Sequence, residues 1–213
     1  MNRIWGKLSG MALSALLVFG HSGCESSKKT PHDFGENDPN TILCVGDSIT
    51  YGYGVPSAQS YPNQLAHLLA RRVINAGVSG EKSWEGRDRF ASLLDRHKPG
   101  YVLILYGAND VIFQQTTGTI DNLRFMVEAA RARQVLPIVA TLTPAFGSHA
   151  YMQQEISNLN PRIRQFASAE RIRLADLERT FKNDPALLLS DGLHPNAEGM
   201  RIIALTFFDK IDE

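Results

Sequence analysis

The sequence predicts an α/β fold in which a five-stranded parallel sheet is covered on both faces by helices. Three observations lead to this prediction. Short runs of Val, Ile and Leu recur along the chain, as in strands that are buried on both faces. The segments between these runs place apolar residues at helical spacing, and the two kinds of segment alternate. The chain has 213 residues, 43% of them hydrophobic, which is enough for one domain with a large core.

Two strands and two helices are predicted between residues 41 and 100. The run TILCVG, residues 41–46, predicts the first strand, and SYPNQLAHLLARR, residues 60–72, predicts a helix with Ser60 as a candidate N-cap. The run RVINAG, residues 72–77, predicts the second strand. It is followed by SWEGRDRFASLLDRHKPG, residues 83–100, a helical pattern whose end is marked by a Pro-Gly pair.

The same alternation continues through the second half of the chain. We expect Pro161 to start or kink the second half of the fourth predicted helix, because a proline removes a helical hydrogen bond. The remaining strands are predicted at 101–107, 135–142 and 172–177, and the remaining helices at 120–130, 152–166 and 202–208.

Three of the predicted strands end in polar turns that contain glycine. Right-handed crossovers bring the carboxyl ends of parallel strands to one edge of the sheet, and ligand sites form outside that edge. The three turns therefore predict a functional site there. They are Gly46-Asp47-Ser48, Gly77-Val78-Ser79-Gly80 and Gly107-Ala108-Asn109-Asp110.

A serine, a histidine and an aspartate have the residue types and the spacing of a nucleophilic catalyst. A serine attacks a carbonyl only when a base accepts its proton, and a carboxylate that orients the base helps it to do so. Ser48 follows the first strand, while Asp191 and His194 lie three residues apart in SDGLHPN, so one loop aims both at one point. The backbone N–H groups of Ser48 and Gly80 and the side-chain amide of Asn109 are candidate donors to an oxyanion.

Four short motifs resemble those of the GDSL lipase/esterase family, also called SGNH hydrolases. GDSIT, GVSG, GAND and DGLH occur in the order of the four blocks of that family, and together they span almost the whole predicted domain. The resemblance implies that Ser48 is the nucleophile, His194 the general base and Asp191 its orienting partner. It also implies that Ser48, Gly80 and Asn109 form the oxyanion hole.

The resemblance implies a fold and an activity as well. The family's fold is a flavodoxin-like three-layer α/β/α sandwich, in agreement with the strand pattern. The spacing of the motifs is most similar to that of the bacterial thioesterase, lysophospholipase and arylesterase branch. The expected activity is that of a serine esterase, which hydrolyses acyl esters or thioesters through an acyl-enzyme on Ser48 and needs no cofactor.

Two other functions remain open at this point. The same residues serve carbohydrate or peptidoglycan O-acetylesterases, and the sequence does not show the depth of the acyl pocket that separates the two activities. A catalytically inactive binding protein of the cell surface would have the same fold. We would expect such a protein to lack one of the motif residues, and none is missing here.

Other classes of ligand have no support in the sequence. The chain carries 22 basic and 22 acidic residues, so it lacks the basic excess that is typical of nucleic-acid binding. Gly52-Tyr53-Gly54 begins like a dinucleotide-binding motif, but it lacks the third glycine and is followed by Pro56. No His, Cys, Asp or Glu residues have metal-ligand spacing, and we predict neither a metal nor a cofactor.

The first 23 residues have the composition of an export signal. Basic residues precede an uncharged run, residues 8–20, which has the length of a signal-peptide core and is short for a membrane span. The motif HSGC resembles the processing site of bacterial lipoproteins, so we predict a signal peptide at 1–23 and lipidation of Cys24. His21 departs from the lipoprotein pattern, which leaves an ordinary secretory signal or an uncleaved anchor as alternatives.

The chain is therefore expected to have three parts. The signal peptide precedes a polar segment, residues 24–40, whose Pro, Gly and charged residues are typical of a flexible tether. The hydrolase domain follows at 41–213. We expect the protein to be exported and attached to a bacterial membrane through the lipid on Cys24, with a small-molecule or lipid ester as its substrate.

Overall fold

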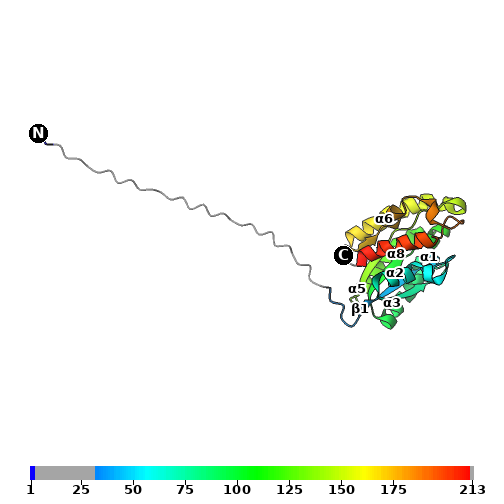
Figure 1. Cartoon of the computed structure of the whole chain (residues 1–213), viewed down its shortest axis with the longest axis horizontal. Coiled ribbons are helices and arrows are strands. Elements are labelled where there is room, and N and C mark those ends of the chain that lie inside the picture. Colours follow the sequence, from blue (N-terminus) through cyan, green and yellow to red (C-terminus); the bar gives the residue numbers. More distant parts are fainter. Residues whose placement is uncertain (3–31, 212–213) are drawn as a thin grey trace. The chain divides into compact units, whose positions relative to one another are not determined.

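A parallel sheet of five strands, in the order β2-β1-β3-β4-β5, forms the centre of the fold (Figure 1). The structure is a computed structural model, and it describes residues 1–2 and 32–211. All five strands lie where the sequence predicts them, although β1 begins a few residues before the apolar run. The strands are β1 (Asp38–Gly46), β2 (Arg72–Gly77), β3 (Pro99–Leu105), β4 (Leu136–Ala140) and β5 (Arg173–Ala175).

Five long helices connect or follow these strands, as the apolar spacing predicts. Ser60 is the N-cap residue of the first of them, but its hydroxyl donates to the Ser57 carbonyl instead of capping the helix. Pro161 lies inside the fourth, which begins eight residues earlier, so of the two expected roles Pro161 does not start a helix, and the kink stays a prediction. The long helices are α2 (Tyr61–Leu69), α3 (Ser83–His97), α5 (Thr119–Arg131), α6 (Gln153–Ala169) and α8 (Ala197–Ile211).

The short helices are additions that the sequence analysis does not contain. A helix of four or five residues is about one turn long, so it presents no periodic apolar stripe. Three short α-helices each begin two or three residues after a strand ends, at α1 (Ser48–Tyr51), α4 (Ala108–Ile112) and α7 (Leu177–Phe181). The 3₁₀ helices are η1 (Ser57–Gln59), η2 (Thr116–Gly118), η3 (Gly147–Met152) and η4 (Pro185–Leu187).

The sheet separates two apolar cores, which gives the three layers of the predicted sandwich. Along β1, Leu43 and Val45 point to the face that α3, α5 and α6 cover. Ile42 and Cys44 point to the opposite face, where α2, α7 and α8 pack. The continuous apolar runs of the sequence are thus alternating side chains that enter two cores, which confirms the predicted α/β/α fold.

The register of the sheet brings three strand ends to the same level. Gly46, the last residue of β1, is paired with Gly77 of β2 and with Leu105 of β3. The segments that follow these three strands therefore leave the sheet side by side, at the edge that the sequence predicts for the site.

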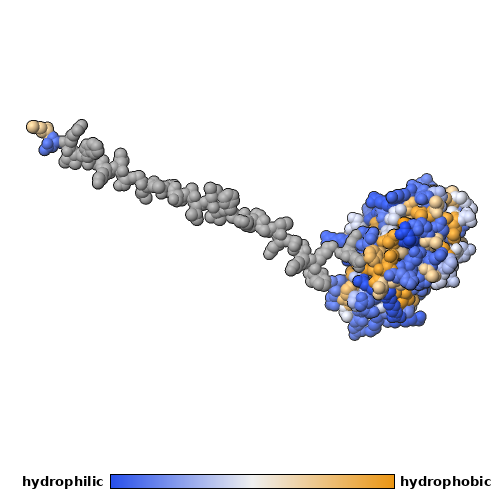
Figure 2. Space-filling view, in the orientation of Figure 1, coloured by the Kyte–Doolittle hydropathy of each residue, from blue (hydrophilic) through white to orange (hydrophobic). Residues whose placement is uncertain are grey.

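None of the described helices combines the length and the hydrophobicity that crossing a membrane would require. Figure 2 shows polar residues interspersed with apolar ones on the face of the domain that it draws.

Candidate active site

The structure brings Ser48, His194 and Asp191 together in one hydrogen-bonded chain. Ser48 is the first residue of α1, and its Oγ lies 3.0 Å from Nε2 of His194. On the other side of the imidazole, Nδ1 lies 2.7 Å from Oδ2 of Asp191. The carboxylate accepts the Nδ1 proton, so Nε2 faces the serine with its lone pair and is able to take the hydroxyl proton.

Asp191 is held in its ionised form by the loop that carries it. Its Oδ1 accepts hydrogen bonds from the backbone N–H groups of Leu193 and His194, at 2.9 and 3.0 Å. Partial burial acts to raise the pKa of Asp191, but the Leu193 amide and the His194 ring and amide outweigh it and hold this pKa below 3.8. The carboxylate therefore stays available to orient the imidazole at neutral pH.

A second loop, between β4 and α6, forms hydrogen bonds with the segment that carries Asp191. The Asp191 carbonyl accepts hydrogen bonds from the Ser148 hydroxyl at 2.9 Å and from Nδ1 of His149 at 2.8 Å. The N–H of Phe146 donates to the Gly192 carbonyl at 2.7 Å. A Cβ at Gly192 would overlap the Phe146 carbonyl, so only glycine fits this close approach. The place of His149 in the loop after the fourth predicted strand indicates that it borders the site, whereas nothing in the sequence points to Ser148.

The turn after β1 aims Ser48 out of the sheet. Asp47 is the N-cap of α1, and its Oδ1 accepts the N–H of Ile49 at 2.9 Å. At Gly46, a Cβ would overlap the Thr50 hydroxyl and lie 2.5 Å from the Leu105 carbonyl oxygen. Gly46 is therefore required by the close packing of α1 and β3, rather than by the sharp turn that a glycine in this position suggests.

The three candidate oxyanion donors are connected through Asn109. Its amide nitrogen donates to the Glu81 carbonyl at 3.1 Å and faces Oδ2 of Asp47 at 3.4 Å. Glu81 follows Gly80 and Asp47 precedes Ser48, so Asn109 is tied to the neighbours of both other donors. Gly80 is exposed and has a φ of +81°, a left-handed conformation that favours glycine.

A network of buried acids lies directly behind these donors. Asp47 and Asp110 are each 1% exposed and Glu81 is 8% exposed. The Glu81 carboxylate accepts hydrogen bonds from Nε of Arg89 at 2.6 Å and from the Tyr106 hydroxyl at 2.5 Å. The described residues contain no group of three or more His, Cys, Asp or Glu that could hold a metal ion.

Asp110 and Asp47 differ in how their charge is compensated. Asp110 accepts the Ser83 hydroxyl at 2.6 Å and the Ser83 N–H at 3.1 Å. Burial, and then the nearby charges of Asp110 and Glu81, raise the pKa of Asp47 from 3.8 to about 7, although the Ile49 amide opposes this change. Asp47 is thus a titratable group near neutral pH beside the predicted nucleophile.

Exposed aromatic side chains lie on the segments that follow the strands, and one of them contacts His194. The ring of Tyr53 lies 4.4 Å from the ring of His194, measured between centroids. The Lys82 ammonium lies 4.5 Å from the centroid of the Phe113 ring and 5.9 Å from that of the Trp84 ring. We call five exposed aromatic residues of the segments that follow β1 to β4 the aromatic rim: Tyr51, Tyr53, Trp84, Phe113 and Tyr151.

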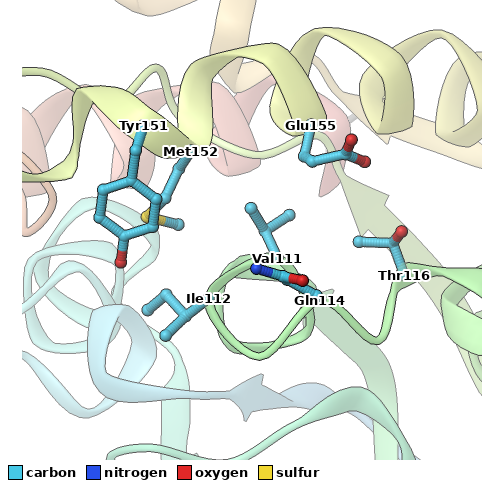
Figure 3. Close-up of a pocket in the computed structure, with 7 residues that line it drawn as sticks. All are labelled: Val111, Ile112, Gln114, Thr116, Tyr151, Met152 and Glu155. Atoms are coloured by element: carbon cyan, nitrogen blue, oxygen red, sulfur yellow. The ribbon is translucent and has the colours of Figure 1, made fainter.

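A pocket of about 350 Å³ opens between α4 and the start of α6 (Figure 3). The first of its lining residues in the chain, Val111, is two positions after Asn109. Both apolar and polar side chains line the pocket. In Figure 3, Tyr151 and Met152 come from one side and Val111 and Ile112 from the other. The remaining lining residues are Gln114, Thr116 and Glu155.

Comparisons with known proteins identify a family and several relatives of this chain. Residues 44–202 match the profile of the GDSL-like Lipase/Acylhydrolase family. The thioesterase 1/protease 1/lysophospholipase L1 of Escherichia coli K12 is 29% identical over 171 residues, which cover 78% of this chain and 80% of that protein. The uncharacterized lipoprotein YqeF of Bacillus subtilis 168 is 30% identical over 143 residues, 61% of this chain and 55% of that one. The crystal structure of TesA has a TM-score of 0.71 at 25% identity, and it covers 80% of this chain and 97% of TesA.

Proposed function

Because the chain belongs to the GDSL-like lipase/acylhydrolase family, a family of esterases, we propose that it hydrolyses acyl esters or thioesters through an acyl-enzyme on Ser48. The observation that carries this proposal is the unbroken hydrogen-bonded chain from Ser48 through His194 to Asp191, at 3.0 and 2.7 Å. A serine with these partners is able to act as a nucleophile at neutral pH.

In the first half of the reaction, Ser48 Oγ bonds to the carbonyl carbon of the ester while its proton passes to Nε2 of His194. Asp191 stabilises the imidazolium that forms. The carbonyl oxygen becomes an oxyanion, which accepts hydrogen bonds from the N–H groups of Ser48 and Gly80 and from the amide of Asn109. When the carbonyl re-forms, the alcohol or thiol leaves with the proton from His194.

In the second half, a water molecule attacks the acyl carbon and gives a proton to Nε2 of His194. The bond between the acyl carbon and Ser48 Oγ then breaks, and the serine oxygen takes the proton back from His194. The products are the free acid and the regenerated enzyme, so no cofactor enters the balance.

Exposed aromatic residues and a partly apolar pocket beside α4, the helix of Asn109, favour an acyl or aryl ester over a sugar acetate. The aromatic rim and the apolar part of the pocket, which includes Val111, Ile112 and Met152, offer contact area to a hydrocarbon chain or a ring. An acetyl group needs no such area. The E. coli relative is named for thioesterase and lysophospholipase activities, which agrees with this preference.

A series of p-nitrophenyl esters from acetate to palmitate, measured beside acetylated sugars, tests the proposal. We expect kcat/KM to rise from acetate to a medium chain. Tyr151→Ala should reduce kcat/KM for the medium chain by at least about threefold and leave the acetate value unchanged. Leu68→Ala, which removes an exposed side chain from α2, is the matched control and should change neither.

Two results would contradict this assignment. A preference for sugar acetates, with no effect of Tyr151→Ala, would support an O-acetylesterase. Failure to hydrolyse every ester, together with failure of a fluorophosphonate probe to label Ser48, would mean that the chain is an inactive binding protein.

Export and membrane attachment are part of the same proposal. The motif HSGC supports lipidation of Cys24, and one relative is named a lipoprotein. Cys24 and residues 3–23 of the predicted signal peptide lie outside the described residues. A lipid on Cys24 would keep the esterase domain at the membrane surface, where lipid esters are concentrated.

A further inference from the structure

Asp47 is a buried carboxyl group that the Ser48–His194–Asp191 chain does not use. Its two oxygens have different partners. Oδ1 accepts the N–H of Ile49 at 2.9 Å, as an N-cap does, while Oδ2 lies 3.4 Å from the amide nitrogen of Asn109. Asp47 therefore links the first turn of α1, which carries the proposed nucleophile, to a donor of the proposed oxyanion hole.

The contact with Asp47 matters for the proposed oxyanion hole because the Asn109 amide has only two hydrogens to donate. The nitrogen carries two hydrogens, and one of them is donated to the Glu81 carbonyl at 3.1 Å. The second hydrogen has two competing acceptors, Oδ2 of Asp47 and the oxyanion of the substrate. At 3.4 Å the bond to Asp47 is weak, so the amide is able to turn from one acceptor to the other.

The charge on Asp47 decides which acceptor prevails. An ionised Oδ2 accepts the amide proton and places a negative charge beside the developing oxyanion. A protonated Oδ2 carries a hydrogen of its own and no negative charge, so it is a much weaker acceptor for an N–H group than the carboxylate. The neutral acid thus leaves the Asn109 proton to the substrate.

The groups around Asp47 favour its neutral form. Among the described residues, no Lys or Arg pairs with Asp47, and the one guanidinium of the network, Arg89, is bonded to Glu81. Asp110 of α4 and Glu81 are both acidic, and together with burial they raise the pKa of Asp47 to about 7. Tyr61 of α2 faces Asp47 as well, and burial holds the pKa of Tyr61 well above its ordinary value, so Tyr61 carries no charge.

Two further titratable groups lie nearby without compensating Asp47. Burial raises the pKa of the Cys44 thiol on β1, so this thiol is neutral. Burial also raises the pKa of the Tyr106 hydroxyl, which donates to Glu81. His194 reaches this region through its hydrogen bond to Ser48, the residue after Asp47.

We propose that Asp47 is a positioning residue whose proton opens the oxyanion hole: the neutral acid leaves the second amide proton of Asn109 to the substrate, and the carboxylate withdraws it. This inference rests on the proposed role of Asn109 in ester hydrolysis. It predicts an alkaline limb in kcat/KM, in addition to the acidic limb that a mechanism with a general base gives. Activity should fall as pH rises through about 7, the pKa of Asp47.

The test compares pH profiles of kcat/KM for the wild-type chain and two variants. Asp47→Asn is neutral at every pH and keeps an acceptor for the Ile49 N–H, so the alkaline limb should disappear while the acidic limb remains. At pH 9, about two units above the pKa of Asp47, Asp47→Asn should exceed the wild type at least tenfold.

Asp110→Asn provides the matched control, because Asp110 is equally buried but makes no hydrogen bond to the Asn109 side chain. This variant should keep the alkaline limb. The limb should move to lower pH, because the negative charge of Asp110 raises the pKa of Asp47. A merely structural role of the acids would lower activity equally at all pH values.

Three results would overturn the inference. They are a wild-type profile without an alkaline limb between pH 7 and 9, an Asp47→Asn profile that keeps the limb, and an Asp110→Asn profile that leaves the limb in place. If Asp47→Asn does not fold, the pH profiles of the wild type and of Asp110→Asn still test the inference. Labelling of Ser48 by a fluorophosphonate at pH 6 separates the two proposals, since its absence contradicts the proposed function and its presence without the limb contradicts only this inference.

Discussion

At the residue scale, the two nitrogens of the His194 ring have different partners and different tasks. Nδ1 faces Asp191 and Nε2 faces Ser48, at 2.7 and 3.0 Å. The Tyr53 ring packs against the imidazole, and the two ring nitrogens keep their hydrogen bonds to Ser48 and Asp191. Because the three residues act together in one proton transfer, the effects of substituting them on the reaction rate are interdependent.

We therefore predict strongly non-additive kinetics for the triad. Ser48→Ala and His194→Ala should each remove nearly all activity, because the base has nothing to activate once the serine is gone. The double variant should be hardly slower than either single one, and Asp191→Ala should be milder. A double variant that loses the product of both single effects would contradict these roles.

Asn109 provides a second test at this scale. Asn109→Ala should lower kcat by about 10²–10³, the usual effect of losing one oxyanion donor, and change KM little. The bond forms chiefly in the transition state, so substrate binding does not depend on it. Steady-state kinetics with one ester measure both constants.

Asn122→Ala is the matched control, since Asn122 is also 7% exposed but donates to Ser83. It should reduce stability without a comparable loss of kcat. Near-normal kcat in Asn109→Ala would mean that this amide does not serve the oxyanion.

At the element scale, the position of α1 depends on its contact with the end of β2. A Cβ at Gly77 would overlap the backbone nitrogen of Tyr51 and lie 2.6 Å from the carbonyl carbon of Thr50. Backbone atoms of a capped helix cannot move aside as a flexible side chain can. Because α1 carries Ser48, its placement against β2 also fixes the distance from Ser48 to His194.

We predict that Gly77→Ala damages both stability and activity. The overlap should lower the free energy of unfolding by about 1–3 kcal/mol, in the range of other overpacked sites. The displaced α1 should slow fluorophosphonate labelling of Ser48 at least tenfold. Chemical denaturation and the labelling rate measure the two effects.

Gly118→Ala is the control for this prediction. A Cβ at Gly118 would meet only the Asn122 amide nitrogen, at 3.8 Å, an ordinary contact. Its stability should change by less than about 0.5 kcal/mol. Equal effects of the two substitutions would refute the role assigned to the contact between α1 and β2.

At the scale of the whole molecule, the sheet collects residues that are far apart in the chain. Ser48 and His194 are separated by 146 positions and meet at the end of β1, an interior strand that lies between β2 and β3. The segment of Asp191 reaches the same edge through its bonds to the loop after β4. All the proposed site residues therefore lie beyond the carboxyl ends of the strands, away from the end at which β1 begins.

The predicted anchor is tested at this scale. If Cys24 is lipidated, the full-length protein should partition into the detergent-rich phase of a two-phase extraction, and Cys24→Ala should abolish this. Cys44→Ala is the control, because Cys44 is buried in β1 and should have no influence on partitioning. A wild-type protein recovered wholly in the aqueous phase, with an N-terminus other than Cys24, would exclude lipidation.

The sequence alone determined the architecture and the three residues of the hydrogen-bonded chain. Strands buried on both faces are continuous apolar runs, and long helices carry a repeating stripe, so both leave local patterns. Asp191 and His194 are also a local feature, because one tight loop positions them. The short helices α1, α4 and α7 left no such pattern, since one turn is too short for a period.

Only the tertiary structure decided what surrounds these residues. Asn109 meets Glu81 and Asp47, which lie 28 and 62 positions earlier, and His149 meets the Asp191 carbonyl 42 positions later. A carboxyl group such as Asp47 has the same appearance in a sequence whether it is solvated or buried. Its pKa depends on desolvation and on charges brought close by folding, and neither is encoded by neighbouring residues. The proton that we assign to Asp47 is therefore a property of the fold and not of the GDS motif that contains it.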